Sequence, residues 1–400
     1  MTVNRMVPPE YHHPRKYLQP LDGIRGLAIL MVICCHAFES NYQTGGLLVR
    51  FVGFLFYYGH FGVDLFFVLS GFLITGILFD SLGDSGFFRK FYARRALRIF
   101  PLYYGVLLVL FVLTHPLHLH WGSMGWLLLT YLQNLHPYAI SNFAPGSGIG
   151  LYHFWSLAVE EQFYLVWPAV VFFVRGKRGL LVTTLAASAG ALLLRLSLLA
   201  GGVPAIDIHV TTICRADSLL LGGSLAMLYR SRSWPRVLQV APWGFLSAAI
   251  IVVTSIFLIE SRVALHPLLG RFWMSGVRYS VLALGFACLI AWSLRPKSMC
   301  QWVFQLKWLR FLGKYSYGIY VLHVLALSVF ALPLRAAILQ ATHSKLLAVV
   351  VAGVVSLSIG ILAAYVSYLY EKPFLRLKHL FDYSRPSLNH SSPEEVMAGR

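Results

Sequence analysis

Residues 60–78 read HFGVDLFFVLSGFLITGIL, and this stretch decides the class of fold. One helical crossing of a bilayer needs about 20 mainly apolar residues, and this run meets that length with a single carboxylate, Asp64, inside it. The whole chain shares this bias: of its 400 residues, 58% are hydrophobic and 12% are charged, and the mean hydropathy is +0.68. Soluble domains carry roughly a quarter charged residues, so an ordinary soluble protein is excluded. We therefore predict an all-α protein that faces lipid over much of its surface.

Apolar runs of this kind recur along the chain and predict a polytopic bundle of about ten transmembrane helices. The runs lie near residues 22–38, 51–79, 99–114, 154–174, 179–200, 211–229, 240–259, 272–294, 315–334 and 346–370. A shorter run, Trp126 to Leu135, predicts a re-entrant or interfacial piece that does not cross. The expected divisions are a cytoplasmic N-terminal segment (1–20), a transmembrane domain (21–380) and a flexible cytoplasmic tail (381–400).

Basic residues set the predicted orientation. The chain has 33 Lys and Arg against 15 Asp and Glu, a net charge of +18. Clusters near 89–98, 295–314 and 372–385 fall on one side if both termini are cytoplasmic, as the positive-inside rule requires. The charge is thus an orientation signal, and we expect the lipid bilayer of the plasma membrane as a partner and no nucleic acid. The five cysteines show no framework spacing, so no disulfide scaffold and no metal site is expected.

The first span carries Asp22, Arg25 and His36. Charges and imidazoles inside a membrane are costly, so each is a functional candidate. Arg25 and His36 are eleven residues apart, which puts them on one face of a helix with about 16 Å between their levels. Asp22 is three residues before Arg25 and close enough to pair with it. The alternative is an interfacial arginine and a buried, hydrogen-bonded histidine without a catalytic role.

Carboxylates are expected at the level of His36, because the predicted topology places Asp64, Glu160 and Glu161 in the outer half of the membrane. An imidazole beside a carboxylate suits general-base activation of a hydroxyl. Glu160 and Glu161 point about 100° apart, so we expect one of them to face His36. Alternatively, both carboxylates stabilise the first turn of their helix through its dipole. Ser70 is expected to be a small residue for close helix packing next to Gly71.

A basic group precedes the third span in the sequence ARRALRIFPLYY (93–104). Arg95 and Arg98, three residues apart, can share a helix face and bind phosphate through paired hydrogen bonds, and Arg94 lies beside them. Ordinary positive-inside anchoring explains some of these charges in any case. The bundle thus has a cationic inner mouth and an imidazole–carboxylate level further out. Their separation resembles the length of the pantetheine arm of coenzyme A, which suits acyl transfer across the membrane.

These stretches resemble the acyltransferase 3 family, integral-membrane enzymes that O-acylate extracytoplasmic glycans and some lipids. The matching segments, which run in order along the chain, are LDGIRGLAILMVICCHAF (21–38), HFGVDLFFVLSGFLITGIL (60–78), RRALRIFPLYY (94–104), FWSLAVEEQFYLVWP (154–168), FLGKYSYGIYVLHVL (311–325) and YEKPFLRL (370–377). The resemblance implies that Arg25 and His36 are essential and that Arg95 and Arg98 lie near acyl-CoA. It also implies acetyl-CoA or another short acyl-CoA as cytosolic co-substrate, with no permanently bound cofactor.

We therefore predict an O-acetyltransferase that moves an acyl group, most readily acetyl, to a hydroxyl of an envelope or exported saccharide, either a glycan or a lipid-linked saccharide. His36 is the expected general base, with Asp64, Glu160 or Glu161 as its partner. Asp22, Ser70 and Trp155 are expected to support these groups. The alternative function is a proton-coupled transporter or flippase with His36, Asp64 and Glu160 as a proton relay.

Overall fold

A computed structural model of the chain describes residues 17–37, 53–54, 56–137, 143, 150–260, 267–342 and 345–383. Within these residues the fold is entirely helical, with no β-strand. The elements are α1 (Gln19–Ala37), η1 (Tyr58–His60), α3 (Phe61–Asp80), α4 (Phe87–Val112), α5 (Gly122–Leu129), η2 (Gln133–Leu135), α6 (Phe154–Val174), α7 (Lys177–Ala200), α8 (Ala205–Val210), α9 (Thr212–Tyr229), α10 (Trp234–Glu260), α11 (Pro267–Phe272), η3 (Trp273–Val277), α12 (Arg278–Ser293), α13 (Met299–Phe304), α14 (Lys307–Lys314), α15 (Ser316–Ala326), η4 (Leu327–Ala331), α16 (Leu332–Thr342), α17 (Lys345–Arg376) and η5 (Leu377–Phe381). The predicted termini beyond residues 17 and 383 lie outside the described residues.

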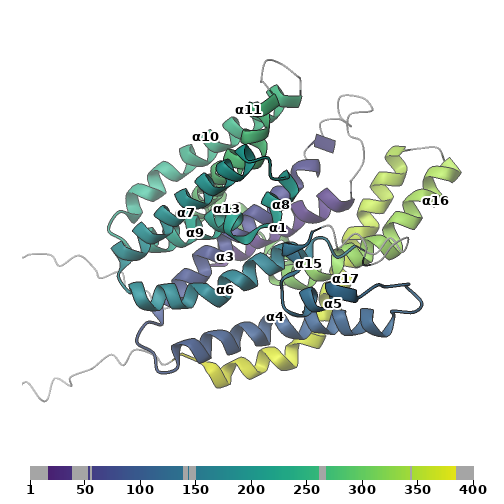
Figure 1. Ribbon diagram of the computed structural model, residues 1–400, viewed down its shortest axis with the longest axis horizontal. Coiled ribbons are helices and arrows are strands. Elements are labelled where there is room, and N and C mark those ends of the chain that lie inside the picture. Colours follow the sequence, from purple (N-terminus) through teal and green to yellow (C-terminus); the bar gives the residue numbers. More distant parts are fainter. Residues whose placement is uncertain are drawn as a thin grey trace, which may run out of the picture.

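Each predicted apolar run coincides with a helix of the bundle (Figure 1). Among the described residues, seven helical stretches are long and apolar enough to cross a membrane. They are Tyr58–Asp80, Phe87–Val112, Phe154–Val174, Lys177–Ala200, Trp234–Ile259, Leu268–Ser293 and Ser316–Thr342. The runs in α1, α9 and α17 are helical too, but they do not meet this criterion, so the count of ten stays a prediction.

The centre of the bundle differs from its rim in burial. The apolar window of Tyr58–Asp80 is 72% buried, whereas that of α10 is 11% buried. α10 projects Ile250 and Phe257 outward, each 65% exposed. An apolar surface of this extent is suited to lipid and unsuited to water. The stretch from Tyr58 to Asp80 is therefore the inner helix around which the others are arranged.

Close contact between α3 and α9 depends on two glycines. A Cβ on Gly71 would lie 1.8 Å from the carbonyl oxygen of Leu219, and one on Gly222 would lie 2.0 Å from that of Val68. Only glycine allows the two backbones to approach this closely, which is the usual way membrane helices pack without a hydrophobic driving force. This contact fixes the polar residues of α3 and α9 against each other.

The weak run near residues 126–135 forms the short helix α5, which has eight residues. At about 1.5 Å per residue such a helix spans about 12 Å, far less than a bilayer core. Trp126 is 73% exposed. A helix of this length is too short to cross a bilayer by itself, which agrees with the prediction that this run does not cross.

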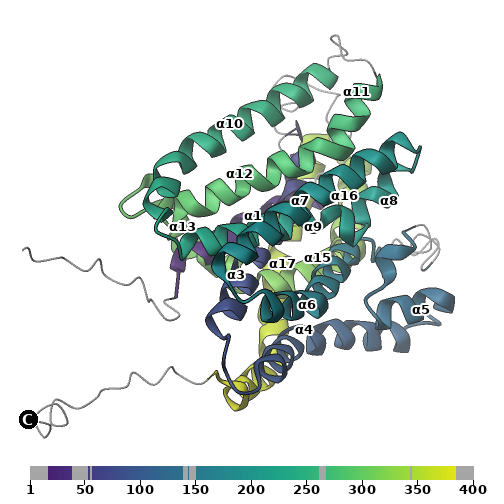
Figure 2. The ribbon, with the colours of Figure 1, turned by 60° about the vertical axis from the view of Figure 1, so that its left-hand side comes forward.

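The two ends of the bundle carry different elements. Figure 2 shows α8 and α11 near one end and α13 near the other. α4 lies along the last part of α17 and η5 at one edge (Figure 1). In the names used below, the inner end is the one at the start of α1, which the sequence predicts to be cytoplasmic. The outer end is the one at which α1 finishes with His36.

Candidate active site

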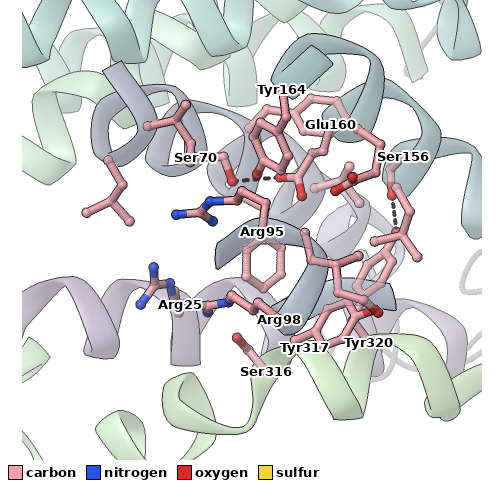
Figure 3. A pocket seen from close by; sticks show the side chains of 18 of the residues that line it. Arg25, Ser70, Arg95, Arg98, Ser156, Glu160, Tyr164, Ser316, Tyr317 and Tyr320 are labelled. Carbon is pink, nitrogen blue, oxygen red and sulfur yellow. Dashed lines mark hydrogen bonds between the residues drawn. The ribbon is translucent and has the colours of Figure 1, made fainter. Parts of the chain in front are cut away.

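A pocket of about 170 Å³ lies between α1, α3, α4, α6 and α15 (Figure 3). It is lined by Arg25, Val63, Phe66, Phe67, Ser70, Leu73, Ile74, Ile77, Arg95, Arg98, Ile99, Ser156, Leu157, Glu160, Glu161, Tyr164, Ser316, Tyr317 and Tyr320. Its charged and hydroxyl side chains lie inside an apolar bundle, where each costs free energy unless it is paired or binds a ligand. We refer to this cavity as the donor pocket.

Three arginines gather on one side of the donor pocket. Figure 3 shows the guanidinium groups of Arg25, Arg95 and Arg98 directed to the same region. Arg25 donates to Asp22 Oδ1 at 3.1 Å, so the predicted pairing of these two residues is confirmed. Arg95 lies over the ring of Tyr164 at 5.6 Å. Among the described residues, neither Arg95 nor Arg98 forms an ion pair, which leaves both guanidinium groups available to an anion.

Arg94 differs from its neighbours and is a correction to the predicted set. Its guanidinium group forms an ion pair with Asp382 and donates to the carbonyl oxygens of Lys378 and Phe381, at 3.3 and 3.4 Å. Consecutive residues on a helix point about 100° apart, so Arg94 faces the chain after α17 while Arg95 faces the donor pocket. Sequence spacing predicted the Arg95–Arg98 face but not this partner, which is 288 residues away.

A further cation, Lys378 in η5, lies close to the basic residues of α4. Burial and the charges of Arg98, Arg95 and Arg94 lower its pKa from the ordinary 10.5 to about 7. Four basic groups within interaction range of one another form a surface to which an anion would bind favourably. The sequence contains no signal for this role, because Lys378 is distant in the chain from residues 94–98.

Glu160 and Glu161 also line the donor pocket, about midway along it (Figure 3 shows Glu160). Ser70 Oγ donates to Glu160 Oε1 at 2.7 Å, which joins α3 to α6. Ser70 was predicted only to be a small residue for close helix packing. In the structure it also donates a hydrogen bond that links two helices. Both carboxylates line the pocket that holds the arginines, whereas His36 does not line it, and this differs from the expected layout. The physical reason is the position of Glu160 along α6. It lies seven residues, or about 10 Å along a helix, beyond His153 and therefore deeper in the bundle.

His36 instead lies among histidines. Its ring contacts the ring of His323 edge-on, with centroids 5.0 Å apart, and His323 contacts His153 in the same way at 4.9 Å. His36 Nδ1 is 2.9 Å from the carbonyl oxygen of Val32. A carbonyl oxygen only accepts, so Nδ1 carries the hydrogen and Nε2 of the neutral ring keeps its lone pair. That nitrogen is the one able to accept a proton.

Tyr320 connects the donor pocket to these histidines. It lines the pocket on the side opposite the arginines, as Figure 3 shows. Its hydroxyl contacts Ser156 Oγ at 2.5 Å and donates to the carbonyl oxygen of His153 at 3.0 Å, and its ring lies 5.5 Å from that of His323. The pocket thus runs from the arginines to a wall shared with the histidine group. The sequence motifs alone give no signal for this role of Tyr320, since the contact links distant helices.

Asp64 and Trp155 lie outside the donor pocket. Asp64 is buried and forms an ion pair with Arg215 of α9, so its partner is a guanidinium group and not His36 as expected. The Trp155 ring packs against Phe67 at 6.0 Å and His209 at 4.6 Å. Arg215 was visible in the sequence as a charge inside a span, the signal that would have identified it.

The histidine group does not form a metal site by its geometry. Within the described ranges, no set of three or more His, Cys, Asp or Glu side chains is arranged to hold a metal ion. The edge-on ring contacts described above are packing contacts between imidazoles.

Comparison with known proteins places the chain in a family. Residues 19–366 match the acyltransferase 3 family, described as an acyltransferase domain. The chain is 32% identical over 340 residues to a putative peptidoglycan O-acetyltransferase, YrhL, of Bacillus subtilis. It is 31% identical over 346 residues to the peptidoglycan O-acetyltransferase OatA of Listeria monocytogenes.

These two alignments cover 78% of this chain but 48% and 49% of the relatives, so the chain spans about half the length of the curated relatives it matches. No solved structure matches the chain. Since the family match extends over most of the sequence, from the first described helix into α17, the protein belongs to the acyltransferase 3 family.

Proposed function

We propose that this protein transfers an acetyl group from cytosolic acetyl-CoA, or another short acyl-CoA, to a hydroxyl of an envelope glycan on the other side of the membrane. The observation that supports this most is the shape of the donor pocket. Arg25, Arg95 and Arg98 lie on one side of it and Tyr320, which contacts the histidine group, lies on the other. The names of the relatives favour peptidoglycan as the acceptor.

The arginines bind the donor in this proposal. Phosphate groups of coenzyme A accept paired hydrogen bonds from Arg95 and Arg98, which share one face of α4 and have no carboxylate partner among the described residues. Arg25 adds a third cation and is oriented by Asp22. The pantetheine arm then extends through the pocket toward Tyr320, and this places the thioester carbonyl near the histidines.

His36 is the general base of the proposed reaction. Its Nε2 accepts the proton of the acceptor hydroxyl as that oxygen attacks the thioester carbonyl carbon. The new C–O ester bond forms, the C–S bond breaks, and the thiolate of coenzyme A leaves and takes up a proton. The carbonyl of Val32 holds the ring in the required tautomer. His153 and His323 form the wall behind it.

Glu160 has a positioning role in this scheme. Through Ser70 it joins α3 to α6 at the middle of the pocket, between the phosphate-binding arginines and the reacting thioester. Glu161 lines the same part of the cavity.

The test is acetyl transfer by the purified full chain in nanodiscs, with radiolabelled acetyl-CoA and peptidoglycan fragments as acceptors. His36→Gln removes the base, and we expect a loss of rate of about 10²–10⁴-fold with unchanged donor affinity. His115→Gln is the matched control, because His115 is exposed outside the pocket and its loss leaves the chemistry intact.

Equal transfer by wild type and His36→Gln would contradict the role of His36. Absence of any transfer, together with proton-coupled uptake of a solute by vesicles containing the protein, would favour the transporter alternative. Donor binding separates the two cases as well, because a transporter has no need of an acetyl-CoA site.

A further inference from the structure

A second group of buried charges lies toward the outer end of the bundle and takes no part in the scheme above. Arg195 of α7, Arg215 of α9 and Arg278 of α12 are 0%, 0% and 6% exposed. We call these three residues the outer arginine cluster. Asp64 and Asp217 are the buried carboxylates beside them. Three guanidinium groups therefore face two carboxylates.

Arg195 is fully satisfied by the protein. It binds Asp217 with two hydrogen bonds, of 2.9 Å and 2.6 Å, and donates to Ser280 Oγ at 2.6 Å and to the carbonyl oxygen of Gly276 at 3.1 Å. Ser280 also donates to Asp217 at 2.6 Å. This closed network joins α7, α9 and α12, and it leaves no donor of Arg195 for a ligand. Its role is structural.

Arg215 and Arg278 are not satisfied in this way. Arg215 forms an ion pair with Asp64 through Nη2, but its Nε and Nη1 are buried without a hydrogen-bond partner. Arg278 has no carboxylate partner among the described residues; its Nε is likewise unpartnered, and its guanidinium group lies over the rings of Phe61 and Tyr279. Arg278 Nη1 has only the weak acceptor Met274 Sδ, at 3.9 Å. Buried N–H groups without a hydrogen-bond partner are unfavourable, so the unpartnered donors of Arg215 and Arg278 point to a ligand.

The unsatisfied arginines and the proposed base, His36, have His60 as a common neighbour. His60 is close enough to Arg215, Arg278 and His36 to interact electrostatically with all three. The donor pocket is on the other side of an aromatic layer, because Phe67 lines that pocket while its ring and that of Trp155 lie 5.7 and 5.9 Å from the Arg215 guanidinium carbon. The outer arginine cluster is therefore a polar region separate from the donor pocket, and His60 lies within electrostatic range of both the cluster and His36.

We propose that Arg215 and Arg278 bind an anionic group of the acceptor, a carboxylate or a phosphate, and so hold the acceptor hydroxyl near His36. That the anion belongs to the acceptor rests on the proposed function, whereas the anion site itself rests on the unpartnered donors alone. Guanidinium groups have a planar fork of donors that matches both anions, and the third positive charge of the cluster would be neutralised by one such group. Peptidoglycan supplies the carboxylates of its stem peptides, and the lactyl carboxylate of muramic acid where no peptide is attached, whereas a lipid-linked saccharide supplies a diphosphate.

The experiment measures binding to the full chain in nanodiscs, without acetyl-CoA. One arm compares the N-acetylglucosamine–N-acetylmuramic acid disaccharide with its methyl ester, which lacks the charge. The other arm compares farnesyl diphosphate with farnesol. The anionic member of at least one pair should bind at least tenfold more tightly than its neutral counterpart, and the arm in which this occurs identifies the source of the anion.

Variants connect that preference to the cluster. Arg278→Gln should lower the affinity for the anionic probe about tenfold and leave that for the neutral one unchanged, while Arg278→Lys should retain most of the preference. Arg271→Gln is the matched control, since Arg271 lies just before Arg278 in the chain and donates to the carbonyl oxygen of Val203. Acetyl-CoA binding to each variant reports that the bundle is intact.

Equal binding of charged and neutral probes by the wild type, or an Arg278→Gln protein with undiminished preference, would overturn the proposal and assign the donors to buried water. Failure of the proposed function would look different: anion binding would persist and depend on Arg278, but no acetyl group would be transferred.

Discussion

The donor pocket and the closed network around Arg195 contain the same residue type in opposite states. In the cluster, Arg195 is held by Asp217 in a closed buried network. In the pocket, Arg95 and Arg98 face an open cavity and form no ion pair with any described residue. Burial with a partner stabilises a fold, whereas burial beside empty space prepares a site for an anion. Intramembrane arginines can therefore be assigned by their partners and not by their position in a span.

The largest effect should come from the closed network. Asp217→Ala leaves the buried guanidinium group of Arg195 unpaired, which should cost about 3–5 kcal/mol of stability. Asp382→Ala is the matched control, because the pair of Asp382 with Arg94 is exposed and should be worth about 1 kcal/mol or less. Thermal unfolding in detergent compares the two, and equal shifts in midpoint would contradict the distinction.

Donor affinity should separate Arg98 from Arg94. Arg98→Gln removes a charged hydrogen-bond donor from the pocket and should weaken acetyl-CoA binding by about 10–100-fold, since such a bond is worth about 1.5–3 kcal/mol. Arg94→Gln makes the same change of charge four residues away, but the Arg94 side chain is directed to η5. It should therefore weaken acetyl-CoA binding much less. Calorimetric titration with coenzyme A measures both. Equal losses would mean that only the overall charge of the region matters.

A smaller effect is expected for Ser70→Ala. The substitution removes the hydrogen bond to Glu160 and should cost about 1–3 kcal/mol of stability, because a partly buried carboxyl oxygen loses its donor. Ser255→Ala is a control on the peripheral helix α10, where the hydroxyl only donates to the carbonyl oxygen of Val252. If both variants unfold at the same temperature, the link between α3 and α6 has no energetic importance.

The smallest effect concerns the pH dependence of donor binding. The pKa of Lys378 is about 7, below its ordinary 10.5, so the side chain is largely neutral in the free protein above pH 7. An anionic donor raises that pKa, so binding should take up a proton and weaken a fewfold between pH 6 and pH 8. Titrations in buffers of different ionisation enthalpy detect the proton, and Lys378→Met should abolish its uptake.

The same lowered pKa has a consequence for stability, in the opposite direction to that of a paired lysine. Between pH 7 and 10.5 the unfolded chain binds the proton that the folded chain has lost, so this residue's contribution favours the folded state more as pH rises. Below pH 7 Lys378 is protonated in both states, and the full cost of its buried charge then lowers the stability of the folded state. A wild-type unfolding midpoint that falls through this window relative to Lys378→Met would contradict the assignment.

Local spacing was sufficient to predict much of the molecule. Apolar runs predicted the helices, and intervals of three residues predicted the pairing of Asp22 with Arg25 and the shared face of Arg95 and Arg98. These features depend on neighbours within one helix. The helical period and the cost of charge in lipid are enough to derive them.

Features that depend on contacts between distant helices were not predictable in this way. The depth at which α6 enters the bundle decides that Glu160 meets Ser70 and not His36. The contact of His36 with His323 joins residues 287 positions apart. Such contacts are fixed by how the helices slide against one another, through glycine contacts such as that of Gly71 with Leu219, and the sequence of one helix does not contain that information.

The most direct test of the account is sided transfer in proteoliposomes. Radiolabelled acetyl-CoA is sealed on the side of the Arg25 end of the bundle, and a glycan acceptor is supplied only on the opposite side. We predict label on the acceptor with the wild type. We predict no label with His36→Gln, and none with the wild type when acetyl-CoA is moved to the acceptor side. Label that appears only when donor and acceptor share one side would contradict a pocket that carries the thioester from the arginines to His36.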